Sequence, residues 1–371
     1  MVKLMSETSQ MGNESWIKYW GEDWVLEGCA SCNGVFVLPP ERVSQRCPVC
    51  GQAALAQMNA TDNRPVYTQP PEMVVPFRAQ EEVLRRSVSQ FAKSVWLAPA
   101  DLQESRLLGR LQSVYLPMWL VDVQVQGDWR AEMGFDYEIV SHREQFKNSG
   151  WQTERVKEKR VRWEPRLGRL NRIYDNQVAP ALEQQAEIES KIGRFLPKDQ
   201  KPFQPDDLTG TIVHLPNRPP EDAWNEAVVV VQTAVSQDCR LASEADHTRG
   251  FKWSPSFANQ NWTQLLLPLY TSYYLDDDNQ AQMVLLHGQS GKLHGIRRAS
   301  MKQARRVAGI ILAVAAVFLL VTLALLGLGF TVAEEALAWA GLVGVLAVGV
   351  GGTAVLPLLY AWYVNSIAKR P

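Results

Sequence analysis

The sequence predicts an α+β protein with a largely antiparallel sheet, an N-terminal metal-binding ribbon and a C-terminal two-helix transmembrane hairpin. Three observations predict this class. Two C-x-x-C pairs lie within the first 50 residues, the middle of the chain mixes helical and strand patterns, and residues 307–368 hold only two charged side chains. A mixture of this kind is typical of α+β folds.

The composition is that of a folded chain. Hydrophobic residues make up 46% and charged residues 21% of the 371 residues, which excludes a mostly disordered protein. The 38 Lys and Arg against 39 Asp and Glu give a net charge of −1, so no overall basic excess attracts nucleic acid. The length is sufficient for two or three domains.

Residues 1–24 form a tryptophan-containing segment in which Trp16, Trp20 and Trp24 are four residues apart. On a helix this spacing places them on one face. We expect this face to pack on the ribbon or the main domain, with insertion into a membrane interface as the alternative. Residues 1–28 contain no apolar signal region, so we expect the following domains to stay on the side where they are made.

Four of the five cysteines form two C-x-x-C pairs separated by 14 residues, and they are Cys29, Cys32, Cys47 and Cys50. Two such pairs supply four thiolates for a tetrahedral Zn²⁺, with no open position for catalysis. Strands are expected at 34–39 and 52–58, so residues 25–58 are predicted to form a zinc ribbon with a structural ion. Two disulfides and a thioredoxin-like redox pair are the alternatives, disfavoured by a cytoplasmic location and by the matched pairs.

Residues 59–72 are polar and contain prolines, which predicts a linker before an α+β domain at 73–300. Apolar spacing predicts four helices, at 80–96, 101–111, 182–195 and 220–240. The last of them carries the fifth cysteine, Cys239, which we expect to pack as a small apolar side chain. Alternation predicts strands at 114–126 and 129–140 joined by a turn at Gly127-Asp128, one or two strands in 155–173, and strands at 262–275 and 282–287.

One segment, residues 155–172, concentrates basic side chains. Eight basic residues stand against two acidic ones, a net charge of +6 (8 − 2), with Trp163 among them. A solvated strand face is the preferred interpretation, and contact with anionic lipid headgroups or with nucleic acid are the alternatives. The residues of this basic cluster are Arg155, Lys157, Lys159, Arg160, Arg162, Arg166, Arg169 and Arg172.

The C-terminal segment is apolar over two stretches, residues 307–330 and 336–364, neither of which holds a charged side chain. At about 1.5 Å per residue the first spans roughly 36 Å, more than a hydrocarbon core of about 30 Å. Aromatic residues near both ends of the second are typical of lipid–water interfaces. Residues 301–371 are therefore predicted to form a basic flank and a transmembrane hairpin that anchors the chain.

The positive charges around the two stretches predict their orientation. Basic residues flank the hairpin on its outer sides, whereas the connector holds only two glutamates. The positive-inside rule then places both termini and the large domain in the cytoplasm. The flanking residues are Arg297, Arg298, Lys302, Arg305, Arg306, Lys369 and Arg370.

Known catalytic motifs are incomplete in this sequence. The run Gly288–Leu293 has Leu293 where a phosphate-binding loop needs Ser or Thr after the lysine. The five histidines are scattered without the spacing of metal ligands. We therefore expect a protein that is not an enzyme.

The order of several short motifs resembles a known family. After the ribbon cysteines the sequence contains Val75-Pro-Phe77, Trp96-Leu-Ala-Pro99, Val114-Tyr-Leu-Pro-Met-Trp119, Tyr174-Asp175-Asn176, Leu266-Leu-Pro-Leu-Tyr270 and Gly288-Gln-Ser-Gly-Lys292. This order is similar to bacterial zinc-ribbon membrane proteins labelled TFIIB-type zinc-ribbon or primosomal-helicase-like, over roughly residues 25–300 and the spans. The resemblance implies zinc on the four cysteines. Some members are encoded beside flotillin-like and PspA-type membrane-stress proteins, which implies these as partners.

The expected function is that of an adaptor or scaffold at the bacterial cytoplasmic (inner) membrane. The hairpin would anchor it in the lipid bilayer, and the ribbon and α+β domain would dock protein partners, in a membrane-stress assembly of PspA-like or flotillin-like proteins. Oligomerisation stays open. The alternative is a membrane-tethered nucleic-acid-binding protein that uses the ribbon and the basic cluster. Salt separates the two, because phosphate contacts weaken steeply with salt and protein docking need not.

Overall fold

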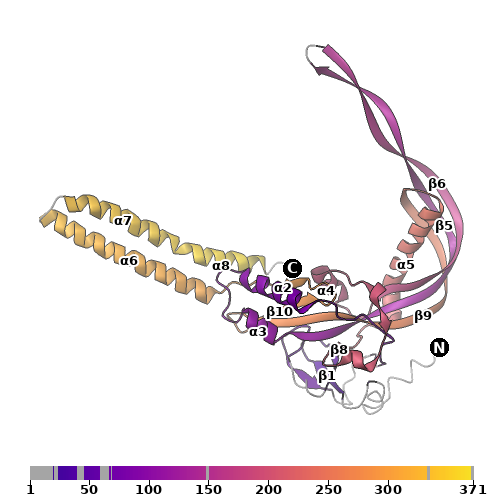
Figure 1. Cartoon of the computed structure of the whole chain (residues 1–371), viewed down its shortest axis with the longest axis horizontal. Coiled ribbons are helices and arrows are strands. Elements are labelled where there is room, and N and C mark those ends of the chain that lie inside the picture. Colours follow the sequence, from indigo (N-terminus) through magenta and orange to yellow (C-terminus); the bar gives the residue numbers. More distant parts are fainter. Residues whose placement is uncertain are drawn as a thin grey trace.

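The computed structural model describes residues 20, 24–39, 46–58, 67, 69–147, 150–331 and 335–368. Figure 1 shows three parts: a body built around a sheet, an apolar helix pair that leaves the body on one side, and a long two-stranded arm that rises from the other. The α+β class with a mostly antiparallel sheet is confirmed. Trp20 and Trp24 pack in one apolar cluster of the body, but Trp24 is not helical and Trp16 lies outside the described residues, so the shared helix face stays a prediction.

The strands of the described residues form one sheet in the order β11-β10-β9-β5-β8-β2-β1-β3, with β6 paired to β5, and β4 to both β7 and β9. Pairing is antiparallel except between β5 and β8 and between β4 and β9. The strands are β1 Val25–Cys29, β2 Val35–Leu38, β3 Leu55–Gln57, β4 Met73–Val74, β5 Gln112–Lys147, β6 Gly150–Pro180, β7 Lys201–Pro202, β8 Ile212–His214, β9 His247–Leu275, β10 Ala281–His287 and β11 Leu293–Gly295.

Three of these strands, β5, β6 and β9, are much longer than the sequence predicts. The predicted turn at Gly127-Asp128 is wrong, because β5 continues straight through it and pairs with β6 on one side and β9 on the other. A Cβ atom on Gly127 would lie 2.4 Å from the carbonyl oxygen of Ser254. Glycine is needed here for the close approach of a neighbouring backbone, not for a turn.

Beyond the end of β9 the β5–β6 hairpin continues alone. Residues 135–147 pair with 150–162, whereas β9 pairs no further along β5 than Gly134. We call these two segments the arm. The sheet is therefore three strands wide beside α5 and two strands wide in the arm (Figure 1).

The four helices predicted in the middle region are confirmed; three are shorter than predicted, and α5 ends two residues later. The best defined, α5, buries one stripe of side chains spaced four apart against β5, β6 and β9, which is the pattern of an amphipathic helix on a sheet. Cys239 belongs to this stripe and is buried, as predicted. The helices are α2 Glu81–Lys93, α3 Glu104–Gly109, α4 Gln185–Ile192 and α5 Pro220–Ala242.

The C-terminal helices are α6 Met301–Thr331, α7 Glu335–Thr353 and α8 Val355–Ile367. Within the described residues, two stretches are long and apolar enough to cross a membrane, Met301–Leu328 and Ala336–Ile367. Only 11% and 17% of their most apolar windows are buried, unlike the core helices of a soluble protein. The break between α7 and α8 comes just before Pro357, which lacks the N–H that would continue the helix.

The helix pair is fastened to the body at its base. Asn365 of α8 exchanges two hydrogen bonds of 3.0 Å with the backbone of Ala299. The amide of Trp96 donates to the Tyr360 hydroxyl at 3.2 Å. Ala304 of α6 and Ala361 of α8 are buried in one apolar cluster with side chains of α2. The junction is therefore part of a packed core and not a flexible linker.

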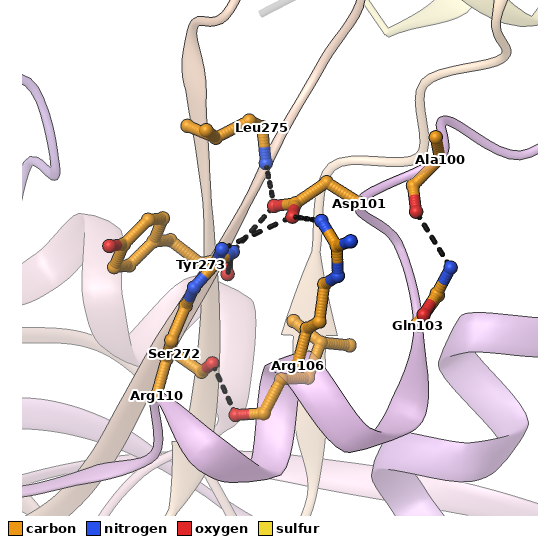
Figure 2. A network of polar contacts seen from close by, with 9 residues as sticks. Ala100, Asp101, Gln103, Arg106, Arg110, Ser272, Tyr273 and Leu275 are labelled. Atoms are coloured by element: carbon orange, nitrogen blue, oxygen red, sulfur yellow. Dashed lines mark hydrogen bonds and ion pairs between the residues drawn. The ribbon is translucent and has the colours of Figure 1, made fainter.

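A buried carboxylate strengthens the same end of the sheet (Figure 2). Asp101 accepts hydrogen bonds from Arg106 and Arg110 and, at 2.7 Å, from the amide of Leu275. Burial acts to raise the pKa of Asp101, but the bonds from the two arginines lower it to about 2. These contacts tie α3 to the last residues of β9, next to the base of the helix pair.

Candidate metal centre

Two tight turns bring the four cysteine sulfurs together. Cys29 ends β1, and its amide donates to the carbonyl of Gly34 at 2.8 Å. In the second turn the amide of Cys47 donates to Ala53 at 2.9 Å, and the amide of Gly51 donates back to Cys47 at 3.0 Å. Gly51 has a φ of +67°, which glycine adopts without strain.

The second turn sits directly on the β9–β10 hairpin. A Cβ atom on Gly51 would lie 2.4 Å from the sulfur of Met283, and the side-chain amide of Gln52 donates to the carbonyl of Ala281 at 3.3 Å. The guanidinium of Arg46 donates to the Gly51 carbonyl at 2.8 Å and lies 5.2 Å from the ring centre of Tyr273. The cysteine turn is thus held by residues far away in the sequence.

The sulfur atoms are arranged as a metal would require. All four lie within 4.8 Å of one another, with 3.6 Å between Cys29 and Cys50 and 3.7 Å between Cys32 and Cys47. A tetrahedral ion with metal–sulfur bonds of about 2.3 Å separates its sulfur ligands by roughly 3.8 Å. None of the four is in a disulfide, whose sulfurs would lie about 2 Å apart. The four cysteines could therefore bind a metal, as the sequence predicts.

Burial and hydrogen bonds act unequally on the thiols: burial raises the pKa of Cys29, whereas the pKa of Cys32 is lowered, which favours its thiolate. The bond with Cys47 holds the pKa of Cys32 at about 5, helped by the backbone amide of Gly34. The same bond, together with burial, raises the pKa of Cys47, so the pair shares one proton. Backbone amides of Val49 and Cys50 act on Cys47 in the opposite direction. Amides pointed at sulfur disperse the negative charge that four thiolates bring to one ion.

The site is continuous with the core of the body. Cys29 and Cys47 are buried in the same apolar cluster as Leu116 and Leu267 of the central strands. Strand β2 pairs with β8, where Phe36 stands opposite His214. His214 is fully buried and lies edge-on to Phe36, and burial lowers its pKa to about 4, so the imidazole is neutral. Nothing local in the sequence indicates this contact, because β8 follows β2 by more than 170 residues.

The basic cluster lies on β6, a single strand where the sequence predicts one or two. All eight side chains are exposed, and alternation along the strand places four on each face. Six of the eight form ion pairs with acidic side chains, at distances between 2.8 and 3.7 Å. Within the described residues Arg155 and Lys159 have no such pair. The cluster is therefore divided between two faces and largely neutralised.

An open hollow of about 940 Å³ lies near the basic cluster, between β5, β6, β9 and α5. Trp129, Phe251 and Trp253 line it together with charged side chains of the strand edges. Its aromatic residues continue the apolar cluster under α5. We interpret the hollow as the margin of that core.

Comparisons of the chain with protein-family models, curated proteins and solved structures found no match. The interpretation of the metal centre therefore rests on its geometry and on the cysteine spacing. The resemblance to zinc-ribbon membrane proteins stays a prediction.

Proposed function

We propose that the protein is a membrane-anchored adaptor that docks cytoplasmic proteins at the bacterial cytoplasmic membrane. One observation carries this proposal: the base of the apolar helix pair packs into the core of the body, whereas the rest of the pair is exposed. Because the sheet packs against the base of the helix pair, it cannot rotate freely relative to the helices. A sheet held rigidly at a bilayer is suited to present binding surfaces at a fixed position relative to the membrane.

In this proposal the four-cysteine segment is a zinc ribbon. Four thiolates with tetrahedral spacing favour Zn²⁺ among the metals common in cells, and they leave no coordination site for water or substrate. The ion would hold the two turns together, and the second turn packs on β10, so its role is structural. Removing it would disturb the sheet as well as the turns.

The membrane and its sides follow from the charge pattern. Basic residues precede α6 at the base of the helix pair, where the body is attached, and the connector between α6 and α7 carries only acidic charges in the sequence. The positive-inside rule then places the body in the cytoplasm. The resemblance found in the sequence makes PspA-type and flotillin-like proteins the first partners to test.

The nucleic-acid alternative receives less support from the basic cluster. A groove for phosphates needs cations gathered on one face and free of internal partners. Here six of eight cations are paired, and the eight are divided between two faces. We therefore place protein docking before nucleic-acid binding.

The test is purification of the tagged full-length chain from detergent-solubilised membranes, followed by identification of bound proteins. We expect the same partner at low and at physiological salt, and no effect of nuclease treatment. The control is a chain with Arg155 and Lys159 changed to Gln, which should keep a protein partner. Loss of the partner on nuclease treatment, together with nucleic acid that remains bound at physiological salt, would establish the alternative.

A further inference from the structure

The arm has no covering element among the described residues. Thirteen residues of β5 pair with thirteen of β6 beyond the last partner from β9. At about 3.3 Å per residue this is a two-stranded projection of roughly 40 Å. Isolated two-stranded hairpins are marginal in water. The length of this uncovered hairpin therefore indicates that the arm contacts another surface.

The end of the arm carries two exposed aromatic side chains. Phe146 and Trp151 stand opposite each other in the strand register, with ring centres 5.6 Å apart. Their exposed fractions are 61% and 72%, high for side chains of this size. An exposed Phe–Trp pair at the extremity of a domain is typical of a contact with a lipid–water interface.

The charge of the arm suits an anionic membrane. Its two segments hold seven basic and five acidic residues, a net charge of +2 (7 − 5). Glu138 and Glu158 are already in ion pairs, and Asp136 shares a hydrogen bond of 2.7 Å with His247. Within the described residues Arg143 and Arg155, which lie within four residues of the aromatic pair, are exposed and form no ion pair, so they are placed to meet headgroups.

The position of the arm points to the same bilayer. In Figure 1 the sheet bends beside α5, and the arm leans back toward the side on which α6 and α7 leave the body. Strand β9 runs without interruption from His247 at the base of the arm to Leu275 beside the junction. The arm and the base of the helix pair are therefore connected through one continuous strand, β9.

We infer that Phe146 and Trp151 enter the headgroup region of the membrane that holds the helix pair, where anionic lipids face Arg143 and Arg155. The arm is then a second membrane contact, which fixes the tilt of the body over the bilayer. This inference rests on the proposed function, because it needs α6 to α8 in the membrane.

The experiment uses the full-length chain in vesicles that contain anionic lipid. Single cysteines replace Phe146, Trp151, Leu167 or Trp339 and carry an environment-sensitive dye, and the parent chain gives the background labelling. Leu167 is exposed on β6 near the base of the arm and serves as the matched control. Trp339 of α7 reports insertion of the helix pair. Quenchers are attached to the lipids at the headgroup–acyl boundary.

We expect dyes at positions 146 and 151 to lose roughly half of their emission, because interfacial side chains lie about 5–10 Å deep. The dye at 339 should also be quenched, and the dye at 167 should not. Quenching at 339 with none at 146 and 151 would overturn the inference and leave the anchor intact. Absence of quenching at 339 would overturn the proposed anchor and the inference with it.

Discussion

At the scale of single residues, the four cysteines join a local pattern to a distant core. The thiols meet because of two turns, but Cys29 and Cys47 are also buried among side chains of the central strands. A metal bound here would stabilise more than the turns. Binding of a structural zinc ion contributes on the order of 10 kcal/mol to folding, so its loss should be visible in the whole body.

Replacing Cys47 with Ser should remove the metal, because a hydroxyl is a poor zinc ligand and Cys47 lies at the buried side of the site. We expect one zinc ion per chain in the parent protein and none in Cys47→Ser, measured by metal analysis of purified protein. The variant should remain in the membrane fraction, since the helix pair does not depend on the metal. Cys239→Ala is the control and should keep its zinc; full zinc content in Cys47→Ser would contradict the assignment.

His214 should make stability depend on pH. Its pKa is lowered by burial from 6.5 to about 4, so the unfolded chain binds the proton more tightly than the folded chain. Stability from this residue is complete above pH 6.5 and falls as the pH drops toward 4, by about 3 kcal/mol in total.

The measurement is denaturant unfolding of the detergent-solubilised chain at several pH values. His214→Asn should lose less stability than the parent between pH 7 and 4, although it is less stable at pH 7. His287 and His294 also have lowered pKa values, and they contribute equally to both proteins. Parallel pH profiles for parent and variant would refute the role of His214.

At the scale of secondary-structure elements, the helix pair is the clearest case in which composition determines behaviour. Its residues are apolar around the whole helix, so no orientation could hide them in water. The base is held by Asn365 and Tyr360, whereas the C-terminal end of α6 and the N-terminal end of α7 lie far from the body (Figure 1).

The topology of the helix pair can be tested with Phe330→Cys, a position at the connector end that is 79% exposed. A membrane-impermeant thiol reagent should label it in intact cells, because the acidic connector is expected outside. A cysteine appended after Pro371 should be labelled only in opened cells. The reverse pattern would place the body on the outer side of the membrane.

At the scale of the whole molecule, the body, the helix pair and the arm share one framework of strands. Two apolar cores lie on β9 and β10: the first contains Cys29 and Cys47, and the second contains side chains of α2. Side chains of α6 and α8 also belong to the second core. The body should therefore respond when its anchor is removed.

Truncation after Arg306 should give a soluble chain that keeps its zinc but loosens locally around α2. The cut removes Ala361 from the second core and two hydrogen-bonded side chains, Tyr360 and Asn365. Each such bond contributes about 1 kcal/mol, so α2 amides should exchange with solvent on the order of ten- to a hundredfold faster. Hydrogen exchange followed by mass spectrometry measures this. Unchanged exchange in α2 would show that the body does not use the helix pair as part of its core.

The sequence by itself determined the features that depend on neighbouring residues. The spacing of Cys29, Cys32, Cys47 and Cys50 predicted a metal centre, because two short turns can each present two thiolates. Uncharged stretches predicted the apolar helices, and apolar spacing predicted α5, because a helix face is set by local spacing. These properties need no knowledge of the rest of the chain.

Only the tertiary structure decided how far the strands extend and what they meet. Gly127-Asp128 suits a turn and a close backbone contact equally well, and the strand at 247–261 that passes beside it selects the contact. In the same way, the fold pairs β2 with β8 and brings Met283 into contact with Gly51. Strand pairing joins residues far apart in the sequence, and its free energy comes from contacts that no local pattern contains.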